Sequence, residues 1–195
     1  MLLQQKTYVI KERVAFAKLT DTYDILDAQS GAVIGTAKEE PPAWAKWLRL
    51  LVNKGLMPTT VNVYEGAGTT PILSIRRGFT FLRARIAVFV GERELGYFES
   101  KLFSLGGAFT IHDTQEHEIG SVKGDWKGWN FTMSAPTGEE LGRVTRKWGG
   151  LGKELFTSAD TYAIALSDTA AMKPDVAPLL LAAGLAIDTV YKEKQ

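Results

Sequence analysis

Four arginines in a short stretch carry the clearest chemistry in this sequence. Arg76 and Arg77 precede Gly78, and Arg83 and Arg85 follow in a segment that alternates basic and apolar residues. An extended strand with this alternation turns Arg83 and Arg85 toward the surface. Guanidinium groups on neighbouring strands hold phosphate through paired N–H donors. The stretch therefore predicts a lipid-phosphate site formed by Arg76, Arg77, Arg83 and Arg85. The alternative is a solvated outer face that nearby glutamates balance.

A second candidate for membrane contact is the segment 43–54. Trp44 and Trp47 recur there at helical spacing, while Lys46 and Arg49 fall mostly on other faces. Two tryptophans opposite basic side chains are typical of a helix that lies in a membrane interface. The alternative is a helix whose tryptophans cover one end of the fold.

Metal binding and catalysis find little support in the sequence. His112 and His117 share one turn with Asp113 and Glu116, and two imidazoles with a carboxylate can form a metal site. A related turn, SAPTGEE, has no histidine, so we interpret this segment as a solvated hairpin turn. The sequence shows no nucleophile elbow, P-loop or dinucleotide fingerprint. We expect no catalytic residues and no cofactor, and hence a protein that is not an enzyme.

Charge and cysteine content restrict the partners. The chain has 195 residues, of which 23 are basic and 22 acidic, with a formal net charge of +1. So small a net charge predicts no nucleic-acid partner. No cysteine is present, which excludes disulfide-linked partners and thiolate ligands. The N-terminus lacks an apolar run of signal-peptide length, and we expect a cytoplasmic protein, peripheral at a membrane if the arginines bind lipid.

The elements that must position these residues are hairpins. Residues 109–126 align without gaps on residues 131–148, and residues 23–39 and 88–101 follow the same order. Each unit reads as a strand, a polar turn and a second strand that begins with an aliphatic residue and glycine. Consecutive hairpins of this kind predict an antiparallel barrel, because closure removes exposed strand edges.

The segment 175–191 predicts the element that fills the barrel. No residue from Val176 to Ile187 is charged, and a helix without a polar face must be buried in protein or lipid. The run is shorter than the roughly 20 apolar residues that a bilayer span needs, and Asp188 ends it. We therefore predict a mainly β (α+β) fold, a closed antiparallel barrel around a central C-terminal helix, as one domain over residues 1–195.

An ordered series of motifs occupies the last third of the chain. Lys147-Trp148 is followed by a glycine-containing turn, by Lys153-Glu154, by Phe-Thr-x-Ala-Asp ending at Asp160, and by the apolar helix ending in Ile187-Asp188. This series resembles the phospholipid scramblase family and the related LURP-one proteins. The resemblance implies the Tubby-like fold, a barrel of about twelve strands around a central C-terminal helix.

The resemblance also implies a class of function. Tubby-like proteins bind phosphoinositides through a basic surface, which implies a non-enzymatic module that recognises anionic phospholipid headgroups at a membrane surface. Two alternatives remain open, namely phospholipid scrambling through membrane insertion of the C-terminal helix and a scaffold whose arginine strand meets a protein partner.

Calcium is a further ligand that the family suggests. The calcium segment proposed for scramblases opens Asp-x-Asp, and here Ser158 and Asp160 stand at those positions. Calcium requires several oxygen ligands, and one carboxylate is missing. We therefore expect no bound calcium and keep Asp160 only as a weak metal candidate.

Overall fold

The fold is an antiparallel barrel with a helix inside it. A computed structural model describes residues 1–13, 20–48, 57–79, 83–101, 108–125, 128–147, 149 and 160–191. The strands in these residues are β1 (Thr7–Glu12), β2 (Thr22–Asp27), β3 (Val33–Glu39), β4 (Thr59–Glu65), β5 (Leu73–Arg77), β6 (Arg83–Val90), β7 (Arg93–Lys101), β8 (Phe109–His112), β9 (Glu118–Asp125), β10 (Asn130–Ser134), β11 (Glu140–Thr145) and β12 (Thr161–Leu166). The helices in the same residues are the 3-10 helix η1 (Leu2–Gln4), α1 (Ala43–Leu48), α2 (Asp168–Ala171) and α3 (Val176–Tyr191).

Strand pairing confirms the predicted barrel. Each strand pairs with its neighbours in the chain, and β1 pairs with β12 to close the ring. The repeated hairpin units are the pairs β2–β3, β6–β7, β8–β9 and β10–β11. Their turns use glycine where the backbone needs a positive φ, with φ values of 68° at Gly31 and 57° at Gly91.

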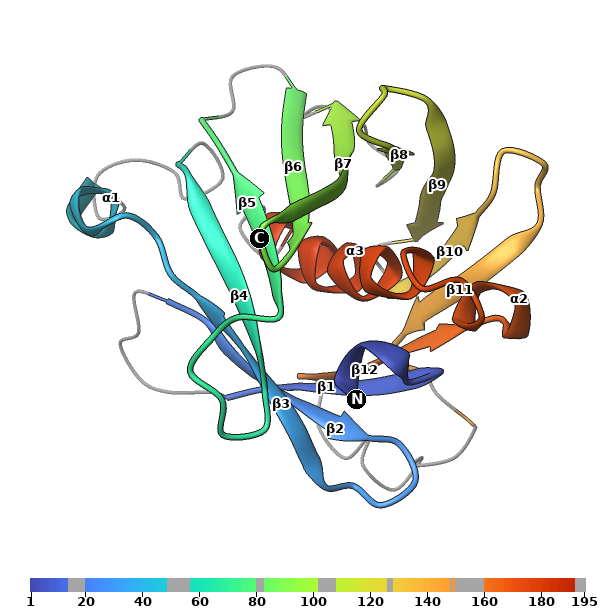
Figure 1. The fold of residues 1–195 in the computed structure, drawn as a ribbon, viewed down its shortest axis with the longest axis horizontal. Coiled ribbons are helices and arrows are strands. Elements are labelled where there is room, and N and C mark those ends of the chain that lie inside the picture. Colours follow the sequence, from blue (N-terminus) through green and yellow to red (C-terminus); the bar gives the residue numbers. More distant parts are fainter. Residues whose placement is uncertain are drawn as a thin grey trace.

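The central position of α3 is also confirmed. Figure 1 shows α3 running through the middle of the ring of strands. Residues 177–188 are all buried, and Leu181 and Leu185 have no exposed surface. A Cβ at Gly184 would lie 2.3 Å from Cδ1 of Ile164 on β12, so the glycine lets the helix approach the barrel wall closely. Apolar surface on every side of α3 is therefore removed from water.

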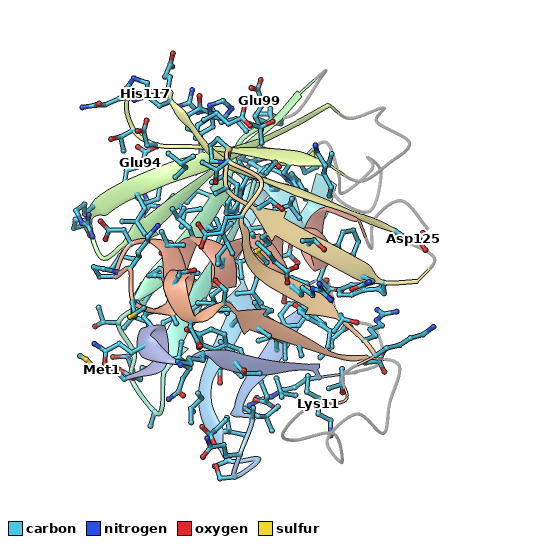
Figure 2. All side chains as sticks on the ribbon, turned by 90° about the vertical axis from the view of Figure 1, so that its right-hand side faces the viewer. Met1, Lys11, Glu94, Glu99, His117 and Asp125 are labelled. Carbon is cyan, nitrogen blue, oxygen red and sulfur yellow. The ribbon has the colours of Figure 1, made fainter. Side chains whose placement is uncertain are left out.

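The barrel has two distinct ends. The turns of the β6–β7 and β8–β9 hairpins lie at one end, and the end of β5, the start of β6 and the end of β9 lie at the other. Figure 2 shows this polarity, with Met1 and Glu94 on one side and Lys11 and Asp125 on the opposite side. We call the latter the β5-exit end. α1 lies at the outer edge of the molecule, beyond the barrel wall (Figure 1).

The interior also holds polar groups. Tyr8, Tyr23 and Tyr162 have at most 1% of their surface exposed, and the carboxylate residue Asp188 of α3 is 4% exposed. Burial raises the pKa of each tyrosine above its ordinary value of 10.0. The charge of Asp188 raises the pKa of Tyr23 and Tyr162 further. These phenols therefore stay protonated in the folded barrel at a pH where the unfolded chain ionises.

Stability should therefore fall as the pH rises above about 10. The unfolded chain releases the phenol protons there and the folded chain retains them, so the free energy of unfolding drops by up to about 1.4 kcal/mol per pH unit for each tyrosine. Tyr162→Phe should flatten this dependence in urea unfolding measured from about pH 8 to about pH 11. An identical dependence in the wild type and in Tyr162→Phe would show that Tyr162 ionises as readily in the folded protein as in the unfolded chain.

Candidate membrane-facing site

Arg76 and Arg85 lie side by side on the outer face of the barrel. Arg76 on β5 is exposed and stands opposite Ala87 on β6 in the strand register. Arg85 precedes Ala87 by two residues, so it points to the same face and is the diagonal neighbour of Arg76. The exposed side of this strand pair thus presents two guanidinium groups, as the alternating pattern predicts for Arg85.

Both guanidinium groups lie over aromatic rings. The guanidinium carbon of Arg76 is 4.3 Å from the ring centre of Phe89, and that of Arg85 is 3.7 Å from the ring centre of Tyr97. Tyr97 is in turn stacked with His112, at 4.8 Å between ring centres and 10° between ring planes. Stacking holds a guanidinium group by its flat face and leaves its N–H edge available for an anion.

Acidic neighbours differ between the two arginines. Nη1 of Arg85 is 4.0 Å from Oε1 of Glu116, and Glu99 stands opposite Arg85 in the register of β6 and β7. Arg76 forms no ion pair within the described residues. An exposed ion pair at 4.0 Å is weak and exchanges readily with an incoming anion. Arg76 is therefore the less neutralised of the two cations.

Arg77 does not belong to this face, and its assignment to the phosphate site is corrected. The period of two along β5 places Arg77 on the inner side when Arg76 points outward. Arg77 is only 5% exposed, and its Nη2 donates to the main-chain oxygen of Met57 at 3.3 Å. The side chain of Arg83 lies outside the described part of the structure.

An exposed aromatic pair lies beyond the end of β5. Trp44 at the start of α1 stacks on Phe79, with ring centres 5.6 Å apart and ring planes at 25°. Trp44 is 49% exposed and Phe79 is 58% exposed. Phe79 follows β5 by two residues, so the pair stands at the β5-exit end. The guanidinium groups of Arg76 and Arg85 extend toward Phe89 and Glu116, away from this end. The two sequence candidates for membrane contact are linked through β5, since Arg76 precedes Phe79 by three residues.

The sequence patterns do not predict the contribution of Phe79. Its only signal is its place after the basic pair and Gly78, in a stretch that ends a strand. Trp44 is confirmed as exposed, whereas the side chains of Lys46 and Trp47 and the whole of Arg49 lie outside the described residues. The helix predicted over residues 43–54 is described only from Ala43 to Leu48.

The histidines and Asp160 have local partners. Nδ1 of His117 is 3.2 Å from Oδ2 of Asp113, and Nδ1 of His112 is 3.3 Å from the main-chain oxygen of Glu116. Among the residues that the structure describes, no group of three histidine or acidic side chains is placed to hold a metal ion. The main-chain oxygen of Asp160 accepts a hydrogen bond from the amide of Glu12, and the preceding residues 150–159 lie outside the description.

Comparison with known proteins identifies the family. The family model named Scramblase matches residues 22–194. The chain belongs to the scramblase family. Altered inheritance rate of mitochondria protein 25 of Saccharomyces cerevisiae is 20% identical over 197 residues, which cover 84% of this chain and 59% of that protein. The chain thus spans less than two thirds of the length of this relative.

A solved structure shows the fold of this scramblase-family chain independently. A crystal structure of an Arabidopsis thaliana protein matches with a TM-score of 0.52 and 14% identity, over 97% of this chain and 92% of that one. The match supports the predicted Tubby-like barrel. In the described part of the chain, none of the helices combines the length and apolar character needed to cross a membrane.

Proposed function

We propose that this scramblase-family domain is a non-enzymatic module that binds anionic phospholipid headgroups at a membrane surface. The observation that carries the proposal is the outward pair Arg76 and Arg85 on adjacent strands, with the exposed Trp44–Phe79 stack at the exit of the strand that carries Arg76. Aromatic rings favour the boundary between headgroups and acyl chains, and arginines favour the phosphates above it. The outer face of β5 and β6 and the exit of β5 therefore carry both kinds of contact that a membrane surface offers.

The geometry of the two arginines favours phosphate as the ligand. Each guanidinium carbon lies over an aromatic ring, which positions the group while its N–H donors remain available to an acceptor. A phosphate oxygen pair accepts from such an edge more readily than a single neutral acceptor does. The module would bind reversibly and peripherally, because two cations and two aromatic rings supply only a small contact area.

The burial of α3 argues against scrambling through helix insertion. α3 has 16 residues, fewer than the roughly 20 needed for a span, and it fills the barrel. Its transfer to lipid would expose the inner faces of the strands to water and carry Asp188 into the membrane. A peripheral role keeps the barrel intact.

Charge reversal of the arginines tests the proposal. Arg76→Glu combined with Arg85→Glu should abolish sedimentation with phosphoinositide-containing vesicles at low salt, because it replaces attraction to the anionic surface by repulsion. Lys173→Glu, an exposed change between α2 and α3 at the opposite end of the barrel, is the control for charge. The melting temperature of the double variant should stay close to that of Lys173→Glu. Unchanged vesicle binding in the double variant would refute the assignment and favour a protein partner for this surface.

Truncation of the aromatic pair should act differently. Phe79→Ala should weaken vesicle binding roughly tenfold, since burial of a phenylalanine side chain contributes about 1.5–3 kcal/mol. This loss should persist at moderate salt, where the arginine contribution is screened. Val33→Ala is the matched control, because Val33 is 53% exposed at the opposite end of the barrel. Equal effects of Phe79→Ala and Val33→Ala would contradict insertion of the Trp44–Phe79 pair.

A further inference from the structure

A second concave site lies on the far wall of the barrel, away from Arg76 and Arg85. An open recess of about 490 Å³ is formed where β9 and β11 end and β10 begins. Its walls include Asp125, Asn130, Arg143, Thr145 and Lys147. Figure 2 shows Asp125 at the β5-exit end. The strands β7 and β8 separate this wall from β6 in the closed ring.

The strand register explains why polar groups converge there. Asn130 stands opposite Asp125 on one side and opposite Thr145 on the other, which places the three in one row across the sheet. Phe131 follows Asn130 and Val144 precedes Thr145, and both of these side chains point into the core. The alternation therefore turns the whole row outward.

Basic side chains gather at the recess although the net charge of the whole chain is small. Arg143 and Lys147 line the recess. Thr132 stands opposite Lys123 on one side and Arg143 on the other, so Lys123 and Arg143 belong to the next outward-facing row of the sheet. Within the described part of the chain, neither Lys123 nor Lys147 forms an ion pair. Two ammonium groups therefore face solvent beside a cavity whose size suits a small ligand.

The carboxylates at the recess are already hydrogen-bonded. Oδ2 of Asp125 accepts from the amide of Gly128 at 2.9 Å. The carboxylate of Glu140 accepts hydrogen bonds from Nε and Nη2 of Arg143, at 2.6 and 2.8 Å. A guanidinium group carries five N–H donors, so Arg143 keeps donors, those on Nη1 among them, for another acceptor. The recess thus offers one guanidinium edge, the Lys147 ammonium group and the Asn130 amide to a single ligand, with Lys123 in the next outward row.

A strained residue holds one wall of the recess. Trp129 lies between Gly128 and Asn130 and has a φ of 48°, a value that non-glycine residues rarely adopt. Its ring packs 4.8 Å from that of Tyr162, and the guanidinium carbon of Arg146 lies 4.3 Å from its centre. Packing on both the core and Arg146 maintains this unusual backbone between Gly128 and Asn130, the two residues that line the recess on either side of Trp129.

We propose that this recess is a second, independent anion site that takes the phosphate group of a small phosphorylated molecule or of a lipid headgroup. Arg143 and Lys147, which line the recess, supply the charge, Lys123 in the next outward row adds to the positive potential, and Asn130 supplies a neutral donor. The volume accommodates a phosphate together with the ring that carries it. The site requires neither Arg76 nor Arg85, so this proposal can be tested independently of the function proposed above.

Titration of the full-length, isotope-labelled protein tests the proposal. Inorganic phosphate and a soluble inositol phosphate, added at low salt, should shift the amide resonances of Gly128, Asn130 and Thr145 in a saturable manner. Lys147→Gln should weaken the affinity for the inositol phosphate about tenfold, the usual effect of losing one charged hydrogen bond. Lys173→Gln removes the same charge from the exposed segment between α2 and α3, at the opposite end of the barrel, and should leave the affinity unchanged.

Three comparisons decide the outcome. The Arg76→Glu, Arg85→Glu protein should still titrate, which would establish independence from the membrane-facing site. If Lys123→Gln with Lys147→Gln also weakens binding to phosphoinositide vesicles, the phosphate is that of a headgroup; if it weakens only the soluble probes, the ligand is a free phosphorylated molecule. Absence of saturable shifts at these amides with either soluble probe, or equal affinity in the wild type and Lys147→Gln, would overturn the proposal.

Discussion

Burial of α3 inside the barrel is the interaction on which the rest of the structure depends. The helix presents apolar side chains in every direction, and the ring of strands is the only described surface that covers all of them. Each fully buried leucine of α3 contributes about 1.5–3 kcal/mol, so neither the helix nor the hollow ring would be stable without the other. Gly184 shows how tight this fit is, because even one added carbon would meet Ile164.

A filled interior moves function to the outer surface. Inward positions are used for packing, as Arg77 shows: the same strand that exposes Arg76 buries its neighbour. Outward positions at the β5-exit end are free to carry charge and aromatic rings. The two proposed anion sites lie on different walls of the barrel, separated in the ring by β7 and β8.

The hairpin repeats and the apolar helix were sufficient to predict the barrel, because both signals are local. A period of two and a turn glycine determine a hairpin within about fifteen residues, and a helix without a polar face must be buried. The inward orientation of the Arg77 side chain follows from the same period of two, but predicting it requires the first residue of β5 to be known. A shift of one residue in a strand exchanges its two faces.

Contacts between distant segments were not predictable in this way. The Trp44–Phe79 stack joins residues separated by the whole of β4 and β5, and nothing in the local pattern around Phe79 distinguishes it from a core residue. The recess at Asn130 likewise depends on cross-strand register and on the strained backbone of Trp129. Register fixes which polar groups converge, and it is a property of the closed barrel.

Hydrogen–deuterium exchange in the presence of phosphoinositide vesicles tests the central claim most directly, because it reports on the helix and on the membrane-facing end together. A peripheral module that binds with its barrel intact predicts new protection at β5 and α1, no change in the β2–β3 turn at residues 28–32, and slow exchange of α3 with and without vesicles. Vesicle-dependent fast exchange along the strands that face α3, or protection confined to the turn at residues 28–32, would contradict the account.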